Sequence, residues 1–196
     1  MKNEKNNIPK KVDKAKWEDV AKSLEVRRKK RFEASRLEEK ECLKNKKLYA
    51  YYKDIQIIKI GNSVLDIGCG NQSLLDHLPD GIIYQGLDPF PFGPQADNVI
   101  KSTIEDCDLL DQSFDTLILF ASLDHCYDVV KVLQQMNRIA KVNIAIRTNI
   151  DKYPSKSHTV GCTRKDLVKG LPDFFLKLET KIDKSNWLFD FWRKIE

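Results

Sequence analysis

From Ser63 to the C-terminus, short apolar runs alternate with stretches of helical spacing, and this alternation limits the possible folds more than any other feature. Alternating strands and helices build a parallel sheet with helices on both faces. Two apolar runs near the C-terminus, 174–182 and 187–192, predict the last two strands of the sheet. The five earlier strands are predicted at 64–67, 82–87, 98–100, 116–120 and 142–146. We therefore predict an α/β fold with a doubly wound, mostly parallel sheet of seven strands.

Helices are predicted between and after these strands. Apolar residues at helical spacing over 129–140 predict a helix that packs on the sheet. Thr163 stands in an N-cap position before a helical stretch at 164–167. The turn after the first strand is expected to lead into a further helix, which would carry His77.

The first apolar run, residues 64–67, leads into a turn that contains two glycines. Gly68 and Gly70 allow a sharp bend and let a ligand approach the backbone closely. Asp66 precedes the first glycine by two residues, and Asp88 ends the next apolar run. A carboxylate in the position of Asp88 can accept hydrogen bonds from both hydroxyls of a ribose, so this pattern predicts a nucleoside cofactor at the edge of the sheet.

These segments resemble the class I, Rossmann-like S-adenosylmethionine-dependent methyltransferases, from the first predicted strand to the C-terminus. An acidic residue before the glycines, here Asp66, is characteristic of that family. A nicotinamide-binding fingerprint instead has a third glycine where this chain has Ser73. The resemblance implies S-adenosylmethionine as the cofactor, with Gly68 and Gly70 lining its methionine part. It also implies that Asp66 orders the turn and that Asp88 binds the ribose.

Further matches follow in the order in which the family has them. By this resemblance, Pro89 and Phe90 cover the adenine of the cofactor. Ile104 and Glu105 belong to the segment at the adenine edge, and Ala121 belongs to the segment below the reactive methyl group. These residues complete the cofactor site that the resemblance implies.

Two residues after the fourth predicted strand are candidates for catalysis. The methyl group is already activated on the sulfonium of the cofactor, so its transfer mainly requires an aligned and partly desolvated acceptor. A hydroxyl acceptor also needs a group that takes its proton, and His125 or Asp124 follows the strand at the right edge of the sheet. The alternative for His125 is a structural bond to the loop backbone. His158 is a further candidate for contact with the substrate.

The basic charge of the chain is concentrated in its first part. Residues 1–53 hold 18 Lys and Arg against 9 Asp and Glu, a net charge of +9, whereas the remainder has a net charge of −4. A helix from about Lys14 would place four apolar residues on one face, namely Trp17, Val20, Ala21 and Leu24. Such a face needs a partner to cover it. We therefore predict that residues 1–53 form a basic tail and an N-terminal helical lid over the acceptor site, and that residues 54–196 form the Rossmann-like methyltransferase domain.

Two smaller expectations concern the same arm. The residues before the first helix are rich in Lys and Asn and lack apolar periodicity, so we expect a mobile tail there. After that helix, a second helical stretch is expected around Leu43, Leu48, Tyr51 and Tyr52.

The predicted reaction is methyl transfer to an oxygen of a small or medium-sized acceptor, such as a metabolite, a sugar or a lipid-linked intermediate. The compact body leaves little room for a recognition domain, and no D/N-P-P-Y/F segment follows the fourth strand, which disfavours methylation of a base amine. A second hypothesis is an RNA methyltransferase whose basic arm, including Arg27 to Arg31, docks RNA. The same glycine turn and Asp88 are also compatible with a nicotinamide-dependent oxidoreductase or with a noncatalytic cofactor-binding protein.

Cysteine placement and hydropathy exclude several other classes. The five cysteines form no C-x-x-C pair and no Cys/His spacing of a zinc site, so we expect reduced thiols and no metal. No apolar run approaches the ~18 residues of a membrane span, and the lysine-rich start lacks the apolar stretch of a signal peptide. We therefore expect a cytoplasmic protein without a membrane span. The sequence indicates no particular oligomeric state.

Overall fold

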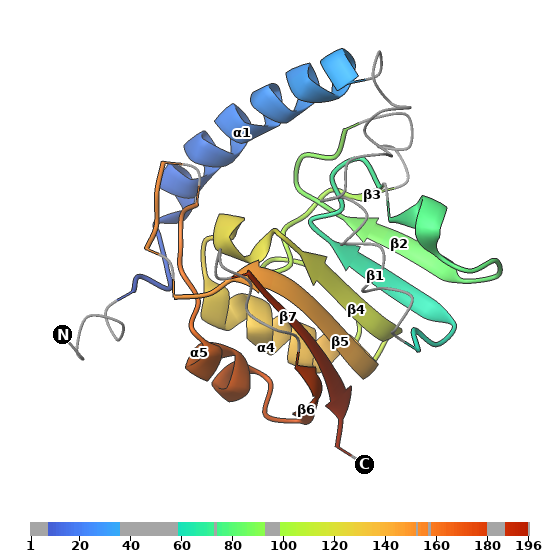
Figure 1. Cartoon of the computed structure of the whole chain (residues 1–196). Helices are drawn as coiled ribbons and strands as arrows, with labels where there is room; N and C mark the ends of the chain where they lie inside the picture. Colours follow the sequence, from blue (N-terminus) through green and yellow to red (C-terminus); the bar gives the residue numbers. More distant parts are fainter. Residues whose placement is uncertain are drawn as a thin grey trace.

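The computed structural model describes residues 8–35, 59–72, 74–92, 99–151, 153–156, 158–179 and 187–195. In this part of the chain, seven strands form one sheet (Figure 1). The strands are β1 (Ser63–Ile67), β2 (Ile83–Leu87), β3 (Val99–Ile100), β4 (Phe114–Phe120), β5 (Ala140–Asn149), β6 (Phe174–Glu179) and β7 (Trp187–Lys194). Their order is β3-β2-β1-β4-β5-β7-β6; β7 is antiparallel to both of its neighbours, and the other neighbouring pairs are parallel. The predicted α/β class, a mixed sheet with helices, is confirmed.

The sheet is buried because successive residues of its central strands enter two apolar clusters. Leu65 and Leu117 belong to the cluster on one face, and Val64 and Ile118 belong to the cluster on the other. The predicted helix, α4 (Val129–Ile139), adds five buried residues to the first cluster: Val129, Val132, Leu133, Met136 and Ile139. This packing fixes the carboxyl ends of β1, β2 and β4 at one edge of the sheet.

Side-chain caps set where the helices begin. The Asp128 side chain accepts a hydrogen bond from the Lys131 N–H at the start of α4. Thr163 caps α5 (Arg164–Gly170), as predicted, and forms a capping box with Asp166. Arg164 then donates two hydrogen bonds to the carboxylate of Asp190 in β7, at 2.7 and 2.8 Å. This buried ion pair fixes α5 to the sheet.

The chain after the glycine turn differs from the prediction. Instead of an α-helix, a single 3-10 turn, η2 (Leu75–His77), follows, and no side-chain hydrogen bond caps its start. Pro79 comes directly after this turn and lacks the N–H that would continue a helix. Because β2 begins at Ile83, few residues are left for a longer helix.

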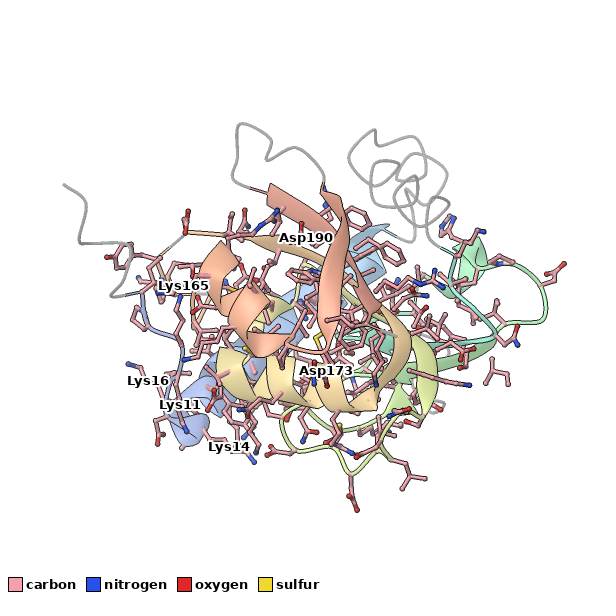
Figure 2. The ribbon with its side chains drawn as sticks, turned by 90° about the horizontal axis from the view of Figure 1, so that it is seen from below. Lys11, Lys14, Lys16, Lys165, Asp173 and Asp190 are labelled. Carbon is pink, nitrogen blue, oxygen red and sulfur yellow. The ribbon has the colours of Figure 1, made fainter. Side chains whose placement is uncertain are left out.

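The N-terminal segment is packed against the body from residue 8 onward. α1 (Lys14–Ser35) begins at the predicted residue, and Lys11 and Lys14 lie at that end of the helix (Figure 2). The prediction of a mobile tail is wrong for residues 8–12, because Ile8 is only 3% exposed. Three backbone hydrogen bonds hold this segment: Val12 N–H to Tyr127 C=O, Val129 N–H to Lys10 C=O, and Gly161 N–H to Pro9 C=O.

Two predictions for the arm concern residues that the structure does not describe. The second helical stretch, with Leu43 and Tyr51, lies outside the described residues, as does the boundary at residue 53. Among the helices that the structure describes, none combines the length and the apolar character that a membrane crossing requires.

Candidate cofactor and acceptor site

Both glycines of the turn after β1 adopt backbone conformations that L-residues rarely take. The φ angle is +74° at Gly68 and +55° at Gly70. A Cβ on Gly68 would lie 2.5 Å from the Cβ of Ser122, and a Cβ on Gly70 would lie 3.2 Å from the ring of Phe92. Ser122 is itself fixed by a hydrogen bond from its Oγ to the Ile67 carbonyl (3.0 Å). The glycines therefore let the segments after β2 and β4 approach the turn.

Asp88 follows β2 and holds this turn through its carboxylate. Its Oδ2 accepts a hydrogen bond from the Gly70 N–H (3.0 Å), and its Oδ1 accepts one from the Phe90 N–H (2.8 Å). Burial raises the pKa of Asp88, whereas these backbone donors and the positive charge of Arg28 act in the opposite direction. An ionised carboxylate has about four acceptor positions, so Asp88 keeps capacity for the hydroxyls of a ligand.

Asp66 of β1 lies behind the turn. Its Oδ2 accepts a hydrogen bond from the Tyr84 hydroxyl (2.8 Å). Burial raises the pKa of Asp66 to about 7, although the Tyr84 hydrogen bond acts to lower it. Asp66 is therefore placed to support the turn from within the sheet.

A cavity opens between this turn and α1, at the carboxyl ends of β1, β2 and β4. Three of the predicted cofactor residues, Asp66, Gly70 and Ala121, are not part of its wall. Ala121 instead donates its N–H to the Arg147 carbonyl of β5 (2.7 Å), and the next residue, Ser122, lines the cavity. The other six predicted cofactor residues line the cavity together: Gly68, Asp88, Pro89, Phe90, Ile104 and Glu105.

Glu105 combines a place in the cavity wall with a structural role. Its Oε1 accepts hydrogen bonds from the backbone N–H groups of Tyr127 (2.9 Å) and Asp128 (3.3 Å). Burial raises the pKa of Glu105, and these backbone donors act to lower it. The carboxylate thus holds the loop that precedes α4.

One face of α1 forms the opposite wall of the cavity. Trp17 is 5% exposed, and its indole N–H donates a hydrogen bond to the His125 carbonyl (2.6 Å). The centroids of its ring and the Phe90 ring lie 6.3 Å apart. The predicted set omits Glu25 and Arg28, which also line this wall. They continue the helical spacing of the apolar residues before them, and extending that spacing to polar residues would have found them.

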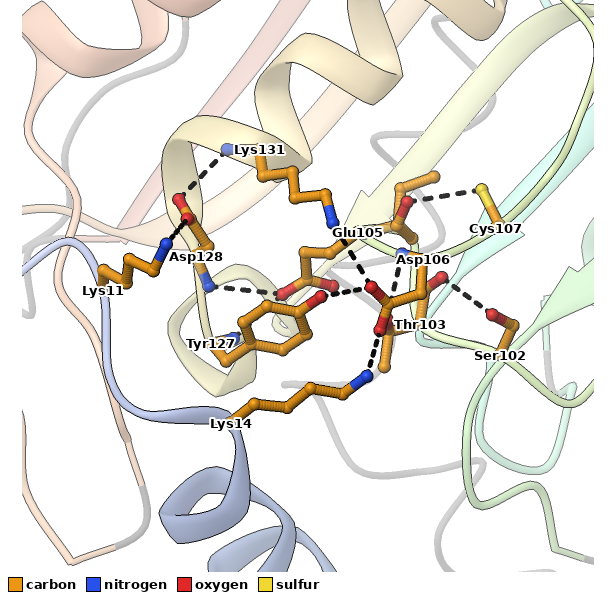
Figure 3. Close-up of polar contacts among 11 residues, drawn as sticks. Lys11, Lys14, Ser102, Thr103, Glu105, Asp106, Cys107, Tyr127, Asp128 and Lys131 are labelled. Carbon is orange, nitrogen blue, oxygen red and sulfur yellow. Dashed lines mark hydrogen bonds and ion pairs between the residues drawn. The ribbon is translucent and has the colours of Figure 1, made fainter.

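Ion pairs fix the start of α1 to the body (Figure 3). Lys14 of α1 and Lys131 of α4 both pair with Asp106, at 2.9 and 3.3 Å. The Tyr127 hydroxyl donates a hydrogen bond to the same carboxylate (2.6 Å). Partial burial would raise the pKa of Asp106, but these three donors and the Thr103 hydroxyl (3.1 Å) outweigh this effect, and the pKa lies below its usual value. Part of the basic arm is therefore occupied in holding α1 against the body.

The predicted catalytic residues, Asp124 and His125, lie in η4 (Leu123–His125) beside the cavity. His125 lines the cavity, whereas Asp124 is 6% exposed and is not part of the wall. His158 Nδ1 lies 2.6 Å from Asp124 Oδ2, and His125 Nε2 lies 3.9 Å from Asp124 Oδ1. His158, the predicted substrate contact, thus joins this cluster from a separate loop rather than lining the cavity.

Comparison with known families gives a match to the central part of the chain. A family model described as a methyltransferase domain matches residues 65–143. The matched segment contains the glycine turn, Asp88 and η4. No curated protein matches the chain.

Solved structures share the fold at low sequence identity. The 1,6-didemethyltoxoflavin-N1-methyltransferase of Burkholderia thailandensis, solved with 1,6-didemethyltoxoflavin and S-adenosylhomocysteine, is 15% identical at a TM-score of 0.62, over 96% of this chain and 94% of its own. A SAM-dependent methyltransferase from Archaeoglobus fulgidus is 17% identical at a TM-score of 0.58, over 76% and 94%. The putative S-adenosylmethionine-dependent methyltransferase of Listeria monocytogenes is 10% identical at 0.57, over 74% and 96%. Residues 65–143 thus match a methyltransferase domain, and the chain shares its fold with S-adenosylmethionine-dependent methyltransferases.

Proposed function

We propose that the protein transfers the methyl group of S-adenosylmethionine to an oxygen of a small or medium-sized acceptor in the cavity under α1. The observation that carries this proposal is the composition of the cavity wall. Gly68 and Asp88 line it on the side of the sheet, while Trp17 and Leu24 line it on the side of α1. A cofactor and an acceptor can therefore lie side by side, and the covering helix favours an acceptor small enough to fit beneath it.

The residues present fit the cofactor. Asp88 has acceptor positions left for ribose hydroxyls, and Phe90 and Ile104 offer apolar surface to an adenine. The positive φ of Gly68 lets the backbone turn without a side chain entering the cavity. We assign Asp66 and Gly70 to the support of this site, because the cavity wall does not include them.

His125 is assigned as the base that takes the proton of a hydroxyl acceptor. When bound, S-adenosylmethionine supplies an activated methyl group, so alignment of the acceptor and removal of its proton are what the protein must add. The Trp17 indole fixes the backbone of His125. Asp124 Oδ1 lies 3.9 Å from His125 Nε2, so a carboxylate faces this ring of the proposed base.

The small acceptor is favoured over RNA by the pairing of the basic arm. Lys14 pairs with Asp106, and within α1 Lys29 pairs with Glu25 at 2.5 Å. Arg28 belongs to the cavity wall. These cations already face carboxylates or the cavity of the same chain, whereas an RNA-docking surface uses its cations on phosphates.

Calorimetric titration of the full chain tests the cofactor. We expect S-adenosylmethionine and S-adenosylhomocysteine to bind and NAD to give no heat. Binding of NAD alone would assign the protein to the nicotinamide-dependent oxidoreductases.

The acceptor is tested with S-adenosylmethionine that carries a tritiated methyl group. The full chain is incubated with the small-molecule fraction of a cell extract or with total RNA from the same extract. We expect label in the small molecules, reduced by His125→Ala and unchanged by His77→Ala, since His77 lies in η2 outside the cavity wall. Label in RNA alone would favour the RNA methyltransferase, and cofactor binding without transfer would favour a noncatalytic protein.

A further inference from the structure

We infer that Asp124, His125 and His158 form a binding site for a divalent transition-metal ion. One ligand atom from each residue can be chosen so that all three lie within 4.8 Å of one another. Two imidazole nitrogens and one carboxylate oxygen form a ligand set that suits Zn²⁺, Fe²⁺ and related ions. The cysteine and histidine spacing of the sequence could not predict this set, because its members come from two separate segments.

Both imidazoles direct a nitrogen toward the same carboxylate. His158 Nδ1 is 2.6 Å from Asp124 Oδ2, which is a hydrogen bond that a structural pair would also make. His125 Nε2 is 3.9 Å from the other oxygen, Oδ1, which is too long for a hydrogen bond. One cation could be reached by all three groups, since a small side-chain adjustment would bring each donor within bonding distance of the same ion.

The backbones that carry the ligands are fixed relative to each other. The Thr159 hydroxyl donates a hydrogen bond to the Cys126 carbonyl (2.6 Å), which ties the loop of His158 to the end of η4. The two imidazole rings are stacked, with centroids 4.6 Å apart and an interplanar angle of 29°. The Trp17 indole holds the backbone of His125 from the other side. Ligands positioned in advance lose less conformational entropy when an ion binds.

The cluster also offers a cation a negatively charged ligand. Asp124 is 6% exposed, and a buried carboxylate is stable only with hydrogen bonds or a positive partner. Three protein ligands leave at least one coordination position for water or for an oxygen of another molecule. Because His125 lines the cavity, that position lies where the acceptor is proposed to bind, and in the metal-bound protein a group at that position, rather than the His125 imidazole, would take the acceptor's proton; this consequence rests on the proposed function, whereas binding of the ion does not.

The test uses untagged full chain that has been treated with a chelator and then titrated with Co²⁺ or Zn²⁺ alone. We expect one ion per chain, with visible Co²⁺ absorption bands that report the protein ligands. His158→Gln and His125→Gln should each weaken the affinity at least tenfold, and Asp124→Asn should weaken it by a similar factor. His77→Gln is the matched control, because His77 is the remaining histidine of the chain, and it should leave the affinity unchanged.

Several results would overturn the inference: no stoichiometric binding, binding unaffected by His158→Gln, or equal losses in the His77 control. If Asp124→Asn fails to fold, the affinity of His158→Gln still decides whether the metal site exists. The His158 side chain is 28% exposed, so we expect the protein to fold without it. S-adenosylhomocysteine is titrated into the same samples. A protein that binds this nucleoside but no metal refutes the metal site alone, and one that binds metal but no nucleoside refutes only the proposed function.

Discussion

At the scale of single residues, Asp88 connects the fold to the proposed cofactor site. Replacing it with alanine removes the acceptors of two backbone N–H groups and the proposed partner of the ribose. Each charge-assisted hydrogen bond contributes about 1.5–3 kcal/mol, so Asp88→Ala should weaken S-adenosylhomocysteine binding by roughly a hundredfold or more. Calorimetry measures this, with the exposed Asp80→Ala as the matched control. An affinity within about threefold of the wild type would remove Asp88 from the proposed site.

A substitution of Gly70 tests whether ligand binding requires a residue without a side chain in this turn. At Gly70 φ is +55° and an added Cβ would lie 3.2 Å from the Phe92 ring, whereas at Gly81 φ is +83° and nothing lies within 4 Å. Alanine at either position should cost about 1 kcal/mol of stability through backbone strain. Only Gly70→Ala should also weaken S-adenosylhomocysteine binding, because it displaces Phe92 beside the site. Urea unfolding and calorimetry compare the two variants, and equal affinities would show that the turn does not act on the ligand.

At the scale of elements, local sequence patterns predict the features that depend on residues close together in the chain. The Thr163 cap agrees with the structure, and each predicted strand overlaps a strand of the structure, although residues 98 and 180–182 of the predicted strands lie outside the described residues. β4 begins at Phe114, earlier than its apolar run, because Asp115 is drawn into the sheet by its backbone hydrogen bond to Ser63 Oγ (2.9 Å). The joining of His158 to η4 depends on contacts between distant segments, which periodicity does not encode.

The docking of α1 is the element-scale feature that a substitution can test. Trp17 is 5% exposed and bonded to the body, so Trp17→Ala should destabilise the protein by about 3–5 kcal/mol. Release of α1 should also speed its cleavage by trypsin, because the helix is rich in Lys and Arg. Val26→Ala, on the same helix but 53% exposed, should change stability by less than about 0.5 kcal/mol. Unchanged stability and cleavage in Trp17→Ala would show that this contact does not hold the lid.

At the scale of the whole molecule, the basic arm meets acidic side chains of the body. Ion pairs with exposed partners contribute about 0–1 kcal/mol each, less than the burial of one tryptophan. Apolar contacts therefore dominate the docking of α1, and the ion pairs orient it. Among the described residues of the arm, Lys11 with Asp128 (3.1 Å) and Lys14 with Asp106 (2.9 Å) are such pairs, and Lys10 with Asp166 (2.6 Å) is a further pair in which both side chains are less than a quarter exposed.

The pH dependence of stability follows from buried carboxyl groups. Burial raises the pKa of Asp66 from 3.8 to about 7 and also raises the pKa values of Asp88 and Glu105. A carboxyl group with a higher pKa in the folded chain binds more protons there than in the unfolded chain. The stability it provides is therefore present at low pH and is lost as the pH rises between the two values.

For Asp66 this window runs from 3.8 to about 7, and the loss across it is at most about 4 kcal/mol. Asp66→Asn keeps an acceptor for the Tyr84 hydroxyl but cannot ionise. We expect this variant to be more stable than the wild type at pH 8 and to lose less stability between pH 4.5 and 8, with the remaining slope due to Asp88 and Glu105. Urea unfolding at each pH measures this, and Asp80→Asn, an exposed carboxyl, should follow the wild type. Parallel curves for Asp66→Asn and the wild type would show that Asp66 ionises no differently in the folded chain.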